Sequence, residues 1–237
     1  MEKSSKGLIE YEKLLEAFAI TKKYLKQQID LGFDQIYLSK KSELENNFSD
    51  SVEQKLKKLY QRIKDCNKCS LHKTRTNFVF GQGSGSSKVL FVGEAPGREE
   101  DLRGEPFVGH AGKLLDKILK AIDFKREDVY IANVLKCRPP GNRDPQPVEI
   151  KECEPHLLQQ IEILKPEIIC ALGRIAAQAL LKTKAPLNQL RGKFHDYHGI
   201  KLIVTYHPAA LLRYPQYKKG CWEDMKMLKR EHDRIMQ

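Results

Sequence analysis

The sequence lacks the long apolar runs that mark membrane-spanning and secreted chains. No stretch in its 237 residues approaches the ~20 apolar residues that a membrane-spanning helix needs. The first residues, Met1 to Lys6, also lack the apolar core of a signal peptide. We therefore expect a cytoplasmic protein without a membrane partner. The chain is long enough for one well-buried core and an appendage.

Acidic residues are too few to balance the basic ones. The chain has 31 Asp and Glu against 42 Lys and Arg, so its formal net charge is +11. A basic excess of this size predicts a polyanionic partner, most simply nucleic acid. The alternative is that lysine-rich helices merely present solvated faces.

Disulfide bonds are not expected, because a reducing compartment keeps thiols free and favours metal binding. Four of the six cysteines form two pairs: Cys66 and Cys69 are separated by two residues, and Cys137 and Cys153 by fifteen. Four thiolates suit either tetrahedral zinc or an iron–sulfur cluster. The wide second pair fits a cluster better than a zinc ribbon, and four unrelated buried thiols are the remaining alternative. For Cys170 and Cys221 we expect core packing and a free thiol.

The N-terminal part differs in composition from the rest. Apolar residues over 8–29 follow the spacing of a helix with a heptad-like seam, too short to establish a coiled coil. Residues 39–50 are polar and read as a linker. We expect residues 1–50 to form a helical extension, either a packing arm or a helix that binds an unknown partner. Residues 51–237 would form the main domain, beginning with a helix capped by Asp50 or Ser51.

Short apolar runs alternate with helical patterns in the main domain, and residues 81–87 read as a flexible loop between its first helix and its first strand. This alternation predicts a three-layer α/β/α domain around a central four-stranded parallel sheet. The predicted strands are 89–92, 129–134, 167–172 and 201–204.

Polar residues follow three of these strands where ligands bind in parallel sheets. Glu94, Asn133 and His207 all fall just beyond a strand end. No Gly-Lys-Ser/Thr follows the glycine-rich turn at Glu94, so it is not a phosphate loop, and a carboxylate there suggests acid–base or electrostatic work. The acids at 99–101 read instead as a solvated helix start.

The segment after His207 has the character of a DNA contact. Leu211 and Leu212 stand beside Arg213, and apolar side chains exposed on a basic loop can wedge between bases. The alternative is that both leucines begin the packing of the final helix.

Taken together, the motifs resemble those of family 4 uracil-DNA glycosylases, the iron–sulfur branch of that superfamily. The resemblance runs from about Val52 to the C-terminus. It rests on the four cysteines and on motifs at Gly93–Gly97, Pro106–Leu115, Asn133–Pro140 and His207–Ala209.

The resemblance implies that uracil is flipped out of DNA into a pocket and that its N-glycosidic bond is hydrolysed. Phe107 matches the aromatic residue that stacks on the base, and Asn133 the amide that reads its edge. His207 matches the histidine that donates to O2 of the leaving uracil. The four paired cysteines match the ligands of a 4Fe–4S cluster with a structural role.

Two pocket positions depart from the superfamily pattern, besides Ala209, which stands where serine is common and weakens one DNA phosphate contact at most. Ala95 lines the substrate site where the best-known members have a water-activating Asp, so Glu94, or else Glu100, must serve hydrolysis. Gly97 replaces an aromatic that excludes thymine, a task that then falls to Glu100. We expect a monomer that acts on uracil-containing DNA, single- or double-stranded. It turns substrate over without covalent capture, because no basic insertion lies between Asn133 and Cys153.

Two other functions stay open. The missing Asp at Ala95 also suits an iron–sulfur module that binds DNA without catalysis. A glycosylase for another deaminated base, hypoxanthine or xanthine, would keep the fold, although the amide of Asn133 favours uracil.

Overall fold

The computed structural model describes residues 18, 21–23, 25–26 and 50–237, and the chain divides into two units at Ser49 and Asp50. Within the expected helix over 8–29, the described residues are helical. The rest of that helix, and the expected linker except for Asp50, lie outside the described residues. The division into an extension and a main domain stays a prediction.

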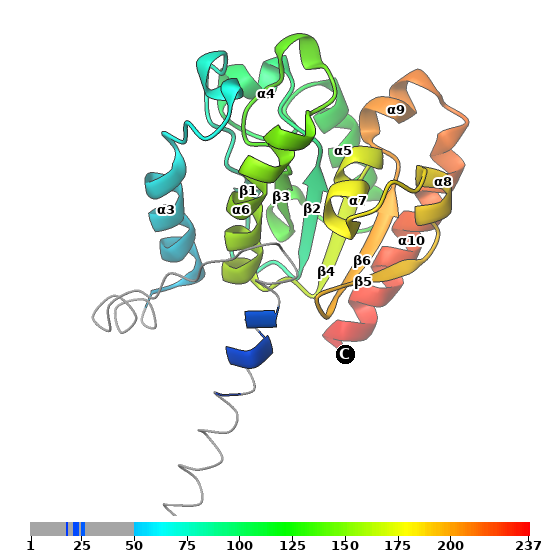
Figure 1. The fold of residues 1–237 in the computed structure, drawn as a ribbon. Coiled ribbons are helices and arrows are strands. Elements are labelled where there is room, and N and C mark those ends of the chain that lie inside the picture. The colour runs from blue at the N-terminus through cyan, green and yellow to red at the C-terminus, as the bar shows by residue number, and fades with distance from the viewer. Residues whose placement is uncertain (1–17, 19–20, 24, 27–49) are drawn as a thin grey trace, which may run out of the picture. The chain divides into compact units, whose positions relative to one another are not determined.

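The unit that begins at Asp50 is built on a six-stranded mixed sheet, with strand order β1-β3-β2-β4-β6-β5 (Figure 1). The four central strands are parallel and match the four predicted ones. Their bounds are β2 Val89–Gly93, β3 Tyr130–Asn133, β4 Ile168–Leu172 and β6 Ile200–Thr205.

Two antiparallel edge strands were not predicted. β1 (Gln82–Gly83) pairs with β3 inside the segment read as a flexible loop, and β5 (Phe194–Tyr197) pairs with β6. β1 contains only two residues, and β5 carries polar residues in partly exposed positions. Neither has the apolar run by which the buried strands were found.

Helices cover both faces of the sheet. In Figure 1, α6 and α7 lie in front of the sheet and α10 lies behind it. Side chains of α5 and α10 form one core cluster with β2, β4 and β6. The helix bounds are α3 Val52–Ile63, α4 Arg98–Arg103, α5 His110–Ala121, α6 Pro147–Leu164, α7 Arg174–Leu181, α8 Leu187–Leu190, α9 Pro208–Arg213 and α10 Tyr217–Met236.

Local sequence explains where two of the helices begin. Ser51 caps α3: its Oγ accepts the Gln54 N–H at 3.2 Å, while Gln54 Oε1 accepts the Ser51 N–H at 2.8 Å. Pro147 opens α6, where its missing N–H removes no helical bond. In the part of the chain that the structure describes, no helix is long and apolar enough to cross a bilayer.

Candidate active site

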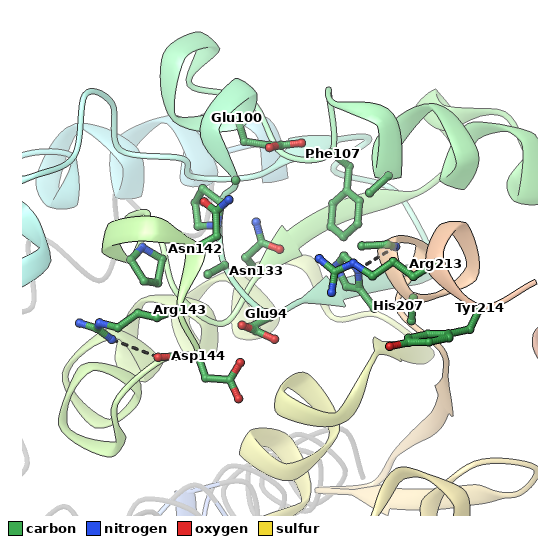
Figure 2. Close-up of a pocket in the computed structure, with 17 residues that line it drawn as sticks. Glu94, Glu100, Phe107, Asn133, Asn142, Arg143, Asp144, His207, Arg213 and Tyr214 are labelled. Atoms are coloured by element: carbon green, nitrogen blue, oxygen red, sulfur yellow. Dashed lines mark hydrogen bonds between the residues drawn. The ribbon is translucent and has the colours of Figure 1, made fainter. Parts of the chain in front are cut away.

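A pocket of about 360 Å³ opens beyond the carboxyl ends of β2, β3 and β6. Glu94, Phe107, Asn133 and His207 all line it, as Figure 2 shows. The parallel register sets Gly93 opposite Asn133, so the first two of these strands end together. The structure therefore brings the predicted strand-end residues into one site, as expected from a parallel sheet.

The side chain of Asn133 is the pocket's most constrained polar group. It is 2% exposed, and its Oδ1 atom has no hydrogen-bond partner. Its main chain is held in place because Val134 N–H donates to the Gly93 carbonyl at 2.9 Å and Leu135 N–H to the Glu94 carbonyl at 3.0 Å. A buried acceptor without a partner is costly unless a ligand satisfies it.

Phe107 forms the apolar wall of the pocket. Its ring is 5% exposed, and its centroid lies 5.4 Å from that of His207. The backbone has a φ of 54°, which is unfavourable for a bulky residue and is found at functional sites. Glycine is required at Gly93, where a Cβ would come within 2.7 Å of the Phe107 ring and collide with Asn133 Oδ1.

His207 stands in a defined protonation state. Burial lowers the pKa of its imidazole to about 4, although nearby Glu100 opposes the shift, so the ring is neutral at pH 7. Its Nδ1 accepts the Ala209 N–H at 3.1 Å and caps the start of α9. In a neutral imidazole the other nitrogen then carries the proton, which makes Nε2 a donor.

The pKa of the Glu94 side chain lies near neutral pH. Burial raises the pKa of its carboxyl to about 7; Asp144 adds to the rise and Arg174 opposes it. Asp144 lines the same pocket (Figure 2). It also forms an ion pair with Arg174 at 2.7 Å. A carboxyl with this pKa can exchange a proton with water at physiological pH. The sequence analysis missed Asp144, whose only signal was a carboxylate in the loop after Cys137.

Glu100 and Asp101 correct the reading of residues 99–101 as a solvated helix start. Glu100 lines the pocket, and its Oε1 accepts the N–H groups of Val108 and Gly109, both at 3.0 Å. A Cβ on Gly97 would come within 2.6 Å of Glu100 Oε2, so that glycine leaves room for the carboxylate. Asp101 is 4% exposed and accepts backbone N–H groups. Only Glu99 fits the earlier reading.

The two leucines after His207, Leu211 and Leu212, differ in their exposure to solvent. Leu211 is 2% exposed and belongs to the core, so the expectation that it is exposed to DNA is wrong. Leu212 is 51% exposed, because it stands on the outward side of α9. Arg213 lines the pocket, as does Tyr214, which is also 51% exposed.

Tyr214, which was not predicted from the sequence, lies at one end of a row of neighbouring aromatic rings and a guanidinium group. Its ring lies 5.6 Å from that of Tyr217, which stacks on Tyr206 at 4.5 Å. The Arg191 guanidinium lies 4.9 Å from the Tyr206 ring and forms an ion pair with buried Asp224. The signal for Tyr214 was an aromatic residue directly after the basic segment at Arg213.

The four predicted ligand cysteines lie in three segments. Cys66 and Cys69 follow α3, Cys137 follows β3, and Cys153 is inside α6. Burial raises the pKa of Cys69, Cys137 and Cys153, and neighbouring thiols raise it further: Cys66 acts on Cys69 and Cys137, and Cys69 on Cys137 and Cys153. Shared contacts also connect the three segments: Arg75 donates to the Cys66 carbonyl at 2.7 Å and to Cys137 Sγ at 3.2 Å, and His156, on α6 with Cys153, lies 3.2 Å from Cys66 Sγ. Among the described residues, however, no three His, Cys, Asp or Glu side chains stand in the geometry of a metal site.

The surroundings of these thiols suit thiolate ligands. Arg75 Nη1 donates to Cys137 Sγ at 3.2 Å, and the Lys136 N–H donates to Cys153 Sγ at 3.2 Å. His156 Nε2 lies 3.2 Å from Cys66 Sγ. Donors aimed at cysteine sulfur stabilise its anionic, metal-binding form and tune a cluster. The donor set fits an iron–sulfur cluster better than four unrelated thiols.

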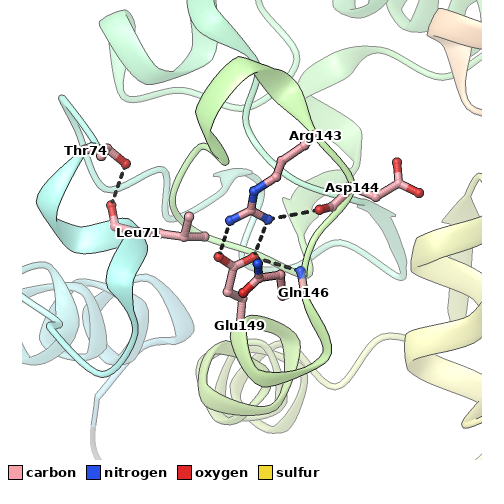
Figure 3. A network of polar contacts seen from close by, with 6 residues as sticks. All are labelled: Leu71, Thr74, Arg143, Asp144, Gln146 and Glu149. Carbon is pink, nitrogen blue, oxygen red and sulfur yellow. Dashed lines mark hydrogen bonds and ion pairs between the residues drawn. The ribbon is translucent and has the colours of Figure 1, made fainter.

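An ion pair between partly exposed Arg143, in the wall of the pocket, and buried Glu149 connects the loop after Cys137 with α6, which carries Cys153. Arg143 donates to both oxygens of Glu149, at 2.9 and 2.6 Å, and the Glu149 side chain is 1% exposed. Glu149 also accepts the Gln146 N–H at 2.8 Å at the start of α6. Figure 3 shows this network beside Leu71, which follows Cys69 in the chain. Arg143 also lines the pocket, so this ion pair ties one residue of the pocket wall to the start of α6.

Comparisons with known proteins agree with this geometry. The family model described as the uracil DNA glycosylase superfamily matches residues 80–226. A type-4 uracil-DNA glycosylase of Archaeoglobus fulgidus is 47% identical over 178 residues, covering 72% of this chain and 89% of the relative. A second, from Pyrobaculum aerophilum, is 47% identical over 182 residues, covering 73% and 92%. A third, from Thermotoga maritima, is 48% identical over 155 residues, covering 65% and 81%.

Proposed function

The chain belongs to the uracil-DNA glycosylase superfamily, in its type-4 branch, and we propose that its pocket takes a uracil flipped out of DNA and hydrolyses the N-glycosidic bond. The reaction releases free uracil and leaves an abasic site in the DNA. The protein is thus a DNA repair hydrolase that acts on N-glycosyl bonds.

The observation that carries this proposal is the unsatisfied Oδ1 atom of buried Asn133. Uracil offers a donor at N3–H and an acceptor at O4, which match the oxygen and the amino group of an amide. Cytosine presents the opposite pattern and would leave two buried polar groups unpaired. A site built to hydrogen-bond one base rejects the other strongly for that reason.

His207 supplies the stabilisation of the leaving group. Its neutral ring has Nε2 as the donor, since Nδ1 accepts the Ala209 N–H. As the glycosidic bond breaks, negative charge develops on uracil O2, and a donor aimed at that atom contributes about 3 kcal/mol. Phe107 stacks on the base and holds it between the strand ends.

Glu94 takes the part of the water-activating residue that Ala95 cannot play. Its pKa of about 7 gives it a substantial carboxylate population at neutral pH, able to orient water and to stabilise positive charge on the sugar. Ala95 lines the pocket beside it. Glu100, fixed by two backbone N–H groups and fitted against Gly97, would exclude the methyl group of thymine.

Cys66, Cys69, Cys137 and Cys153 would hold a 4Fe–4S cluster, whose contribution is to fold and order the segments around it. The neighbouring thiols and the donors from Arg75 and Lys136 support this assignment. On the DNA side, Arg213 and Tyr214 line the pocket, and exposed Leu212 precedes them in the chain. These three side chains would contact the strand next to the flipped nucleotide. The net charge of +11 favours binding to its phosphates.

The proposed function also leads to an oligomeric state, a location in the cell and a role for the N-terminal residues. A single chain carries every proposed site residue, so the enzyme would act as a monomer, in the cytoplasm, on single- or double-stranded uracil-containing DNA. The family match begins at residue 80, and we assign residues 1–50 to binding a separate partner and not to catalysis.

A panel of oligonucleotides tests the function. The lesions are uracil opposite guanine, opposite adenine and in a single strand, together with hypoxanthine and xanthine. Free uracil and alkali-labile sites are expected from the uracil substrates only. Salt-dependent binding without base release would identify a non-catalytic module, and release of hypoxanthine or xanthine alone would reassign the substrate.

A further inference from the structure

Lys136 is a buried cation for which the reaction described above has no use. Its side chain is 0% exposed. Its Nζ donates to the main-chain carbonyl of Asn133 at 2.8 Å and to Gln160 Oε1 at 2.6 Å. Gln160 is also fully buried and donates to the Phe80 carbonyl at 2.9 Å. The ammonium thus links the base-reading residue to α6.

Both acceptors of this ammonium are neutral, which leaves its charge uncompensated by hydrogen bonding alone. Within residues 50–237, no carboxylate forms an ion pair with it; its neighbours are two of the proposed ligand cysteines, Cys137 next to it in the chain and Cys153 on α6. The backbone N–H of Lys136 also donates to Cys153 Sγ. A buried charge without an opposite charge is strongly unfavourable, so a fully buried lysine indicates a nearby anion.

The thiolates of a cysteine-ligated cluster would provide that anion. Four thiolates carry more negative charge than the iron–sulfur core offsets, so the ligated site is anionic. We propose that Lys136 is a positioning residue: its ammonium holds the Asn133 carbonyl in place and is itself kept in the core by the negative charge of the four-cysteine site. The inference rests on the proposed function and on the proposed cluster. Through the side chain of Lys136, the charge of the cysteine site would thus affect the position of Asn133, which reads the base.

Lys136→Met tests the proposal, because methionine fills a similar volume without charge or donors. The variant is purified without air, and its iron content, the reduction potential of its cluster and its kcat and KM for a uracil oligonucleotide are measured. Removing a positive charge beside the cluster makes reduction harder, so the potential should shift to more negative values. The loss of the Asn133 contact should lower kcat/KM for uracil by roughly 10–100-fold, as is typical when a supporting partner is removed.

The matched control is Lys88→Met, which removes an exposed lysine paired with Glu167 at 3.3 Å on the surface. This variant should keep the wild-type potential and the wild-type kcat/KM. If Lys136→Met does not fold, Gln160→Met carries the test. It keeps the ammonium but removes one of its acceptors, so a several-fold loss of kcat/KM is expected with the iron content unchanged.

The outcomes separate this inference from the function on which it rests. A wild-type protein that releases no uracil overturns the function before any variant is made, and an iron-free wild type overturns the cluster. A wild type that contains iron and releases uracil, with Lys136→Met unchanged in potential and kcat/KM, overturns the role of Lys136 alone. Wild-type kcat/KM in Gln160→Met does the same where that variant is used.

Discussion

The base pocket and the cysteine site are assembled in different ways from neighbouring parts of the chain. The pocket takes single side chains from the ends of three parallel strands, including Asn133 and His207, and leaves the Asn133 oxygen without a partner. The cysteine site draws on three segments, and its sulfurs are already met by donors from Arg75 and Lys136. The Asn133 oxygen lacks a protein partner and is free to accept a hydrogen bond from a ligand, whereas the sulfurs of Cys137 and Cys153 already accept hydrogen bonds from the protein. Substitutions in the pocket should therefore reduce catalysis, whereas substitutions at the cysteine site should reduce the stability of the fold.

The largest expected effect is on the cysteine side. Cys137→Ser should lose iron and destabilise the domain, with a fall in Tm of roughly 10 °C, equivalent to about 3–4 kcal/mol for a chain of this size. Activity should fall with the folded fraction. Iron analysis measures the loss of the metal, and thermal unfolding measures the change in Tm. Cys170→Ala, at a fully buried position in β4, is the control and should keep its iron. An iron-free Cys137→Ser protein with wild-type Tm would break the comparison.

His207→Ala should show the opposite pattern, in which chemistry is lost and the fold is kept. Removing a donor aimed at developing charge lowers kcat by about 10²–10³, while KM and iron content should stay close to the wild type. Single-turnover kinetics measure the effect. His232→Ala on α10, outside the pocket lining, is the matched control. A loss confined to KM would assign His207 to binding instead.

Asn133→Asp sharpens the role of the unpaired oxygen. The carboxylate still accepts a hydrogen bond but can no longer donate to uracil O4, so uracil excision should fall by about 10²-fold, equivalent to a few kcal/mol for a buried group left unpaired. Selectivity for uracil over cytosine should narrow, which parallel assays on the two bases measure. Unchanged selectivity would remove Asn133 from base reading.

The pH dependence should report Glu94. Its pKa is about 7, and water activation needs the carboxylate, so excision should rise as pH increases through about 7. Asp144→Asn removes a charge that raises this pKa, so the rise should move to lower pH. His207, with a pKa of about 4, stays neutral over this range. Rates measured from pH 5 to 9 test this, and Glu94→Gln should abolish the rise; a rise that persists in Glu94→Gln belongs to another group.

The smallest effect should come from Leu212 on α9, for which its neighbour Leu211 is the contrasting core position. Leu211→Ala empties a core position and should cost about 2–5 kcal/mol of unfolding free energy. Leu212→Ala, at an exposed position, should change stability by less than about 0.5 kcal/mol and raise KM for DNA several-fold. Denaturant unfolding and steady-state kinetics separate the two. Equal KM values for Leu212→Ala and the wild type would remove that side chain from the DNA contact.

The sequence alone predicts an element or a site residue when the pattern that marks it lies within a few adjacent residues. The four central strands were predictable because each is a short apolar run, and Asn133 and His207 because they lie at or just beyond the carboxyl ends of such runs. β5 was not, since its half-exposed edge residues break the apolar pattern. Asp144 and Tyr214 were missed because their approach to the pocket depends on tertiary packing. Leu211 and Leu212 are identical in type, and only the orientation of α9 distinguishes them.

Recognition of uracil depends most on the hydrogen bond that Asn133 Oδ1 accepts from N3–H of the base. Its direct test is a single-turnover comparison of two single-stranded oligonucleotides that differ in one group, one with uracil and one with N3-methyluracil. The methyl group removes the donor and leaves O2 and O4 in place. We predict rapid release of uracil and a loss of at least about 10²-fold for the methylated base, as expected when a buried acceptor is left unpaired. Equal rates for the two bases would contradict the account.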